Sequence, residues 1–213
     1  MKSSMPKQFL PLLGESIFLR SLCLFRNMRK EVDSIVVVLD ESYRSDYQDI
    51  VESEKGRIRW ANPGVERQDS VFQGLQQVPD ECHIVAVHDV ARPLVTPAEV
   101  SAVIRDGTTH GAAVLGVPMK ATVKESEDGS FVLRTIPRHR LWEIHTPQVV
   151  RKDLLLKGFD LVHREKIEVT DDVSIIEALG LPVKLTLGEY TNIKITTPED
   201  IQVAEGILAS RTQ

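Results

Sequence analysis

Residues 83–93 read His-Ile-Val-Ala-Val-His-Asp-Val-Ala-Arg-Pro, and this stretch decides the fold class. Its first half, His83–Val87, is continuously apolar after the histidine, which is typical of a strand covered on both faces. Ionisable side chains follow at once, in His88, Asp89 and Arg92. Ligands of open α/β sheets bind beyond the carboxyl ends of the strands, so this loop is a candidate site.

Similar apolar runs lie on both sides of this stretch and alternate with helical segments. We predict further strands at 34–39, 57–61 and 112–117, a short strand containing Asn192-Ile193-Lys194, and helices at 16–28, 43–54, 66–77, 96–107, 173–179 and from 197 onward. Two helices begin with a capping threonine followed by proline, at Thr96-Pro97 and Thr197-Pro198. Gly107 is a plausible helix stop. Strands separated by helices predict an α/β fold: a mostly parallel sheet with helices on both faces.

One segment interrupts this alternation. Residues 121–124 and 130–136 read as two strands joined by Glu127-Asp128-Gly129, and an Asp-Gly pair is a hairpin turn signal. The segment is more polar than its neighbours. We therefore predict a β-hairpin arm over residues 118–140 that projects from the sheet of a single domain, 1–213.

The bulk composition narrows the function classes. The 213 residues carry a net charge of −5, which argues against a general nucleic-acid surface because such a surface needs a basic excess. No apolar stretch approaches the length of a membrane span, so no membrane partner is expected. Residues 1–11 resemble neither a signal peptide nor a transit peptide. Cys23 and Cys82 are far apart and in no metal-ligand spacing.

Several polar residues fit a phosphate or nucleotide site, and each also has a simpler interpretation. Asp89 could hold Mg²⁺, which takes one or two carboxylates plus phosphate oxygens; alternatively it satisfies loop amides and pairs with Arg92. Gly64 permits close approach of a ligand to the backbone. Ser70, one turn into a helix, could face a base or ribose; alternatively residues 66–71 are only a charged helix start.

The remaining candidates are weaker when taken one at a time. Lone lysines such as Lys7 and Lys194 are usually solvated. At Thr170-Asp171-Asp172, at least one carboxylate is expected to cap the helix at 173–179.

Seven short motifs nevertheless occur together in one order. They are Pro6-Lys7-Gln8-Phe9-Leu10-Pro11-Leu12, Glu66-Arg67-Gln68-Asp69-Ser70-Val71, His88-Asp89-Val90-Ala91-Arg92-Pro93, Leu141-Trp142, Thr146-Pro147-Gln148, Thr170-Asp171-Asp172 and Asn192-Ile193-Lys194. Their order and spacing over essentially the whole chain resemble the 2-C-methyl-D-erythritol 4-phosphate cytidylyltransferases. Residues 111–118 and 190–194 look more like plant or algal members of that family than like enterobacterial ones.

This resemblance implies a Rossmann-like nucleotidyltransferase that transfers a cytidylyl group from CTP to methylerythritol phosphate in the non-mevalonate isoprenoid pathway. It implies Mg²⁺ as cofactor and a homodimer whose arm reaches the neighbouring subunit. The implied residue roles are phosphate contact and catalysis for Lys7 and Lys194, cytosine binding for Gly64 and Ser70, CTP and Mg²⁺ binding for Asp89, and substrate binding for Thr122 and Arg138 of the arm and for Thr146, Thr170 and Lys194.

The chain also departs from the resemblance. Family members begin with a strand and a glycine-rich loop ending in Arg-Met, ahead of the segment that residues 1–8 resemble, and the 213 residues contain no counterpart. Two alternatives follow: a catalytically impaired form that acts as a dimerising or regulatory subunit, or a cytidylyltransferase for another polyol phosphate. The expected location is the plastid stroma for a plant or algal source and the cytoplasm for a bacterial one.

Overall fold

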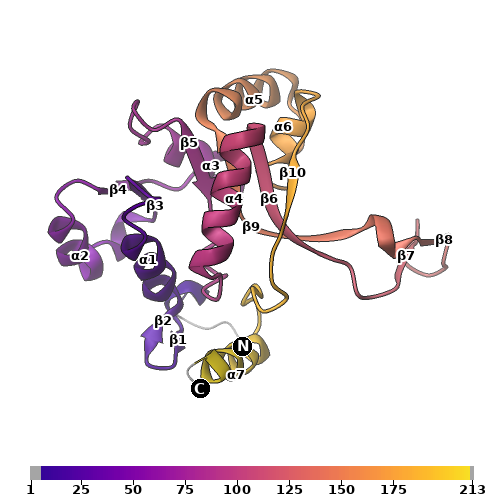
Figure 1. The fold of residues 1–213 in the computed structure, drawn as a ribbon, viewed down its shortest axis with the longest axis horizontal. Coiled ribbons are helices and arrows are strands. Elements are labelled where there is room, and N and C mark those ends of the chain that lie inside the picture. Colours follow the sequence, from indigo (N-terminus) through magenta and orange to yellow (C-terminus); the bar gives the residue numbers. More distant parts are fainter. Residues whose placement is uncertain (1–5, 212–213) are drawn as a thin grey trace.

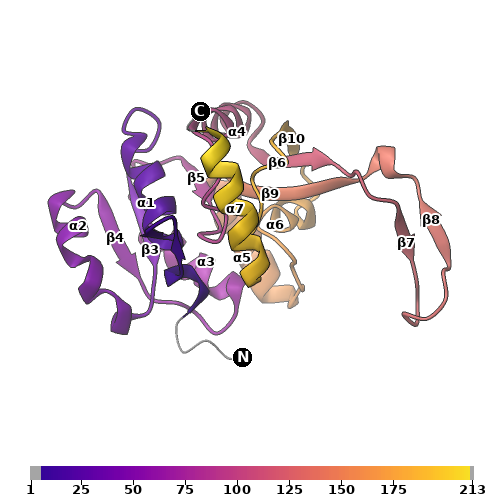
Figure 2. The same cartoon turned by 90° about the horizontal axis from the view of Figure 1, so that it is seen from below.

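The computed structural model describes residues 6–211. Residues 1–5, the first part of the segment 1–11 that resembles no targeting peptide, lie outside the described residues. Figures 1 and 2 show a body of helices around a twisted sheet and one long arm. The helices are α1 Ile17–Asn27, α2 Gln48–Ser53, α3 Arg67–Leu75, α4 Pro97–His110, α5 Lys152–Glu165, α6 Ser174–Ala178 and α7 Pro198–Arg211. The strands are β1 Pro11–Leu12, β2 Glu15–Ser16, β3 Ile35–Val38, β4 Ile58–Ala61, β5 Ile84–Val87, β6 Ala112–Pro118, β7 Val123–Glu125, β8 Arg134–Ile136, β9 Trp142–Arg151 and β10 Lys184–Leu187.

The larger sheet has the order β10-β6-β9-β5 and is mixed. Strand β10 runs parallel to β6, whereas β9 is antiparallel to both β6 and β5, with Val149 opposite Ala113 on one side and Ala86 on the other. The predicted α/β fold is confirmed, and the larger sheet is mixed: β10, β6 and β5 run in one direction and β9 in the other. The reason is β9: it carries the chain back from the arm, and so it enters between β6 and β5 in the opposite direction.

A second, smaller sheet consists of β3 and β4, paired in parallel. Within residues 6–211, β3 pairs only with β4 and β5 pairs only with β9. A cavity of about 700 Å³ lies between these two sheets and is lined by β3 and β5 together with residues of α1, α3 and α4. We call this cavity the groove.

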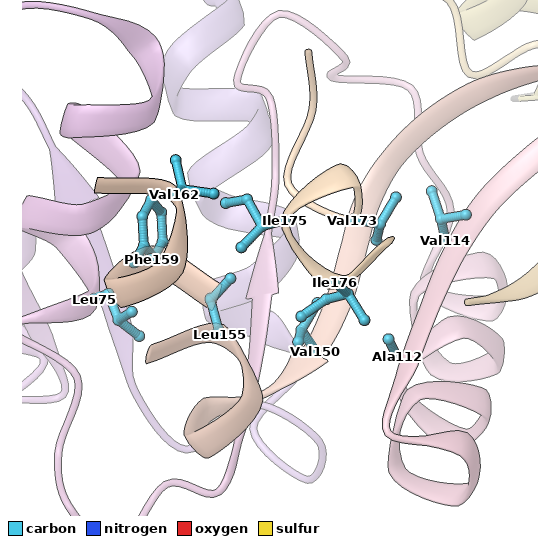
Figure 3. Close-up of a cluster of buried hydrophobic side chains, with 10 residues drawn as sticks. All are labelled: Leu75, Ala112, Val114, Val150, Leu155, Phe159, Val162, Val173, Ile175 and Ile176. Atoms are coloured by element: carbon cyan, nitrogen blue, oxygen red, sulfur yellow. The ribbon is translucent and has the colours of Figure 1, made fainter. Parts of the chain in front are cut away.

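Helices cover both faces of the larger sheet, as predicted. On one face, α5 and α6 pack over Ala112, Val114 and Val150, in the cluster of buried side chains drawn in Figure 3. On the other face, Val100 and Val103 of α4 contact the alternate set of strand residues, Ala113, Leu115 and Val149. This alternation is the two-residue period of a strand buried on both sides.

Local sequence signals set several element ends. Thr96 and Glu99 form the reciprocal capping box predicted for α4. Helix α4 was expected to stop at Gly107, but it continues to His110. A Cβ on Gly107 would lie 2.5 Å from a methyl carbon of Val149, so this glycine permits helix–sheet packing, and the stop is Gly111 with φ +89°.

The hairpin is confirmed at the predicted place. Strands β7 and β8 pair antiparallel, and Gly129 of the turn has φ +73°. Figure 2 shows this hairpin at the end of an arm that extends well away from the helices of the body. In the part of the chain that the structure describes, we find no helix long and apolar enough to cross a bilayer.

Candidate functional site

An ion pair stands at the carboxyl end of β5. Lys194 Nζ lies 2.6 Å from Asp89 Oδ2, and the Asp89 side chain is about three-quarters buried. Burial alone would raise the pKa of Asp89, but the hydrogen bond and positive charge of Lys194, with a further contribution from Arg67, lower it below its usual value. Asp89 is therefore a carboxylate at neutral pH. The simpler interpretation, in which it pairs with Arg92, is wrong.

Arg92 has another role because it is buried. Its guanidinium donates to the backbone carbonyls of Asn192, at 2.7 Å, and Ile144, at 3.3 Å. The amide of Ile195 donates to the carbonyl of Ala91 at 2.8 Å. The segment that carries Lys194 is thus tied to the loop that carries Asp89. These contacts hold residues 192–194 outside any sheet, so the predicted short strand there is wrong.

Lys7 approaches the same segment from the N-terminal side. Its Nζ donates to the carbonyl of Thr196 at 2.6 Å, two residues beyond Lys194. Lys7 is exposed, as is much of Lys194, so both ammonium groups remain accessible to an anion. The structure therefore pairs Lys194 with Asp89 and places the Lys7 ammonium against the backbone two residues further along the same segment.

Gly64 and Ser70 are also brought together. The Ser70 hydroxyl accepts from the Gly64 amide at 3.0 Å and donates to the Glu66 carbonyl at 3.1 Å. A Cβ on Gly64 would lie 2.2 Å from Asp69 Cβ, so only glycine allows this loop to fold onto the first turn of α3. Ser70 and Asp89 both line the groove.

Thr170 is exposed beside a second, smaller cavity of about 100 Å³, which Arg67 also lines. Arg67 donates to both oxygens of the buried Asp172, at 2.9 and 2.7 Å. Burial raises the pKa of Asp172, and the two hydrogen bonds and the positive charge of Arg67 oppose that rise. Asp171 caps α6 by accepting from the Ser174 amide at 2.9 Å, as expected for one of the two acids.

Thr146 lies beneath the pair. Only 5% of it is exposed, and its hydroxyl contacts the Asp89 amide and His88 Nδ1. Thr122 and Arg138 are exposed on the arm, which leads away from the body in both views. The Arg138 guanidinium donates to the Lys120 carbonyl at 3.0 Å. Within one chain, the structure does not bring these two arm residues to the Asp89 site.

The donor set fits a magnesium ion only in part. Among residues 6–211, no group of three or more histidine, cysteine or acidic side chains is arranged to bind a metal. Asp89 supplies a single ionised carboxylate, and its Oδ2 already contacts Lys194. Mg²⁺ commonly uses one or two carboxylates together with substrate phosphates, so Asp89 suits an ion that arrives with a nucleotide.

Two residues of this site were not among the sequence candidates: Arg67 and Asn192. Each stands inside a motif that was singled out. Neither has a spacing signal, because its partner is distant in sequence; Arg67 and Asp172 are 105 residues apart. Only the fold reveals what these side chains contact.

Comparisons with known proteins agree with this geometry. The sequence profile of a family described as IspD, 2-C-methyl-D-erythritol 4-phosphate cytidylyltransferase, matches residues 1–210. The chloroplastic protein of that name from rice is 52% identical over 98% of this chain and 70% of its own length. A protein of that name from Desulforamulus reducens is 37% identical over 99% of this chain and 91% of its own.

Solved structures give the same result. A 4-diphosphocytidyl-2C-methyl-D-erythritol synthase from Anaerococcus prevotii superposes with a TM-score of 0.87 at 29% identity, covering 95% of this chain and 93% of that one. The 2-C-methyl-D-erythritol 4-phosphate cytidylyltransferase of Thermus thermophilus gives 0.80 at 32% identity, with the same coverages.

Proposed function

This chain belongs to the 2-C-methyl-D-erythritol 4-phosphate cytidylyltransferase family, and from that premise we propose that Lys7, Lys194 and Asp89 bind the phosphate groups of its substrates. Its reaction is cytidylyl transfer from CTP to 2-C-methyl-D-erythritol 4-phosphate, which gives 4-diphosphocytidyl-2-C-methyl-D-erythritol and pyrophosphate for isoprenoid synthesis. The predicted activity is confirmed. Neither alternative, the regulatory subunit or the different acceptor, is supported by the comparisons.

The single observation that carries the proposal is the contact of 2.6 Å between Lys194 Nζ and Asp89 Oδ2. In the reaction, a phosphate oxygen of the acceptor forms a bond to the α-phosphorus of CTP while the bond to the pyrophosphate oxygen breaks. Two polyanions must approach each other, so the protein has mainly to supply positive charge and orientation. Lys194, held by Asp89, and Lys7, held at Thr196, supply charge at fixed positions.

The other contacts are assigned by position. We propose that the Gly64 loop and Ser70 hold the cytosine, because Ser70, whose hydroxyl accepts from the Gly64 amide, borders the same groove as Asp89. Thr170, beside the Arg67–Asp172 pair, and the buried Thr146 belong to the sugar-phosphate side of the site.

We propose that a divalent cation binds at Asp89 together with the nucleotide. The carboxylate would hold Mg²⁺ together with phosphate oxygens of the nucleotide, and the ion would offset negative charge on the phosphates. Lys194 then lies beside the same carboxylate and orients it. Asp89 thus has two functions in this proposal, as an anchor for Lys194 and as a metal ligand.

We propose that the arm forms a homodimer. It exposes three consecutive apolar residues beyond its turn: Phe131 is 80% exposed, Val132 61% and Leu133 54%. Exposed apolar groups gathered on one projection are typical of an interaction surface. In such a dimer, Thr122 and Arg138 of one subunit would reach the substrate that is bound to the body of the other subunit. Light scattering should show a dimer, and Phe131→Ser combined with Leu133→Ser should shift it toward monomer; an unchanged mass would contradict an arm-mediated dimer.

The location follows from the relatives. Because the chloroplastic rice protein is 52% identical, we propose the plastid stroma if the source is a plant or alga; bacterial relatives near 37% identity support the cytoplasm if it is a bacterium. Fractionation of the source cells, with detection of this chain, distinguishes the two.

The phosphate-binding proposal is tested by pyrophosphate release with CTP, Mg²⁺ and methylerythritol phosphate. Lys194→Met should lower kcat/KM by roughly 100-fold or more, since it removes a charge aimed at the reacting phosphates. Lys157→Met is the matched control, because Lys157 is exposed on α5, away from the motifs of the site. Equal rates for Lys194→Met and the control would overturn the assignment.

A further inference from the structure

The hydroxyl of Thr146 stands between two partners, both at hydrogen-bond distance. The backbone amide of Asp89 donates to Thr146 Oγ1 at 3.0 Å. On its other side, Oγ1 lies 3.1 Å from His88 Nδ1. A hydroxyl has one proton to donate and two lone pairs with which to accept. The question is therefore which way its single proton points.

The second nitrogen of His88 answers this. Nε2 lies 3.2 Å from the carbonyl oxygen of Arg92, and a carbonyl oxygen only accepts. Nε2 must therefore carry a hydrogen. The ring packs against Phe25, with centroids 4.9 Å apart, and both of its nitrogens face uncharged partners, which favours a neutral imidazole. In a neutral ring with hydrogen on Nε2, Nδ1 is a bare acceptor, so the Thr146 proton must point to it.

Burial agrees with this assignment. Thr146 is 5% exposed, which leaves almost no surface for a ligand to contact. The Thr146 proton is committed to His88, and one of its lone pairs is committed to Asp89.

We propose that Thr146 is a positioning residue that has no proton to donate to substrate, and that His88, as its Nε2–H tautomer, fixes Thr146 in this role. The kinetic part of this proposal rests on the proposed function, whereas the tautomer does not. In this role Thr146 does not donate a hydrogen bond to the substrate; instead, its hydroxyl holds the backbone at Asp89 in place.

The position of Thr146 gives it influence over both members of the ion pair. Its hydroxyl holds the Asp89 amide, and its carbonyl accepts from Nδ2 of the fully buried Asn192 at 3.0 Å. Asn192 is two residues from Lys194. Thr146 thus joins the two backbone segments whose side chains meet at 2.6 Å.

The first test is independent of turnover. Nitrogen-15 NMR of histidine-labelled protein at neutral pH should show His88 with hydrogen on Nε2 and none on Nδ1. His88→Asn identifies the resonance. A ring with hydrogen on Nδ1, or on both nitrogens, would overturn the proposal because Thr146 would then be free to donate elsewhere.

The second test uses a double-mutant cycle in the pyrophosphate assay. Thr146→Val should lower kcat/KM by about tenfold for CTP and acceptor alike, because the hydroxyl's hydrogen bonds to His88 and to the Asp89 amide are both lost. His88→Phe, which keeps the ring contact with Phe25, should cause a similar loss, and the double variant should lose no more than either. Thr146→Ser retains the hydroxyl and should remain close to wild type. His88→Asn, with an oxygen near the place of Nδ1, should recover part of the loss.

The outcomes separate the two hypotheses. A rise in KM for the acceptor alone in Thr146→Val, additive with His88→Phe, would mean direct substrate donation and would contradict the positioning role. An inactive wild-type chain would contradict the proposed function, and the NMR result would still decide the tautomer.

Discussion

The two sheets beside the groove are built from similarly apolar sequence, but the centre of the larger sheet is buried far more than strands β3 and β5, which border the groove. In the larger sheet, Ala113, Leu115 and Val149 are completely buried between α4 on one face and α5 and α6 on the other. In the smaller sheet, Ile35, Val36 and Val37 of β3 are only half-buried, and Val38 is 36% exposed. The difference teaches that an apolar run predicts a strand, whereas its burial depends on which elements cover its faces and edges.

The comparison implies unequal stability, which a pair of matched truncations can measure. Phe159→Ala should lower the free energy of unfolding by about 3–5 kcal/mol, because Phe159 is fully buried against Phe72 and Leu155. Ile35→Ala should cost only about 1 kcal/mol, because Ile35 faces the groove and is only partly buried. Urea unfolding of both variants gives the two values. Similar losses would break the distinction between the two sides.

The pH dependence of stability tests the same comparison at the edge of the groove. The pKa of His88, which lines the groove at the end of β5, is lowered by burial from 6.5 to about 4. Between these values the unfolded chain binds the proton and the folded chain does not. Stability is therefore complete above pH 6.5 and falls as the pH falls toward 4, by at most about 3 kcal/mol from this group.

Unfolding free energies measured from pH 7 to pH 4.5 check this for wild type and His88→Asn. Subtracting the two profiles removes the contributions of other groups, among them His145, whose pKa burial also lowers. Parallel profiles for the two proteins would show that His88 is not the group responsible.

A smaller effect is expected where the two sides are joined. Arg67 on α3, a helix that packs on β3, binds Asp172 at the start of α6 on the larger sheet. Arg67→Met should cost about 2 kcal/mol, since it removes two hydrogen bonds to a buried carboxylate. Asp172→Asn should lower the stability of the Arg67→Met variant much less than it lowers the stability of the wild-type protein. Arg164→Met, which breaks an exposed pair with Glu165, is the control and should change stability little. Strict additivity of Arg67→Met and Asp172→Asn would mean that the pair does not couple the two sides.

Signals contained within a few residues were sufficient for much of the fold. The capping box at Thr96, the turn at Gly129 and the apolar run of β6 were all predictable because their partners are local. Strand β9 was not predicted, because Pro147 interrupts a run that mixes charged and apolar residues. Helix α5 was not predicted either, although its buried residues Leu155, Phe159 and Val162 do recur at helical spacing.

The site depends on distant contacts. Nothing local indicates that Lys194 contacts Asp89, and only the resemblance to a family placed these residues together. Residues 192–194 carry a strand-like pattern, but the Arg92 contact to the Asn192 carbonyl draws them into a loop instead. The direction of the Thr146 proton depends on the Arg92 carbonyl behind His88, which no spacing rule could supply.

The arm has a genetic consequence. Thr122 and Arg138 lie on the projection, whereas Lys194 and Asp89 lie in the body, so a dimer that exchanges arms would build each centre from two polypeptides. Inactivating alleles would then fall into two complementing classes. A cell that expresses one chain defective in the arm and another defective in the body would regain one working centre in each mixed dimer, whereas two body alleles would rescue nothing.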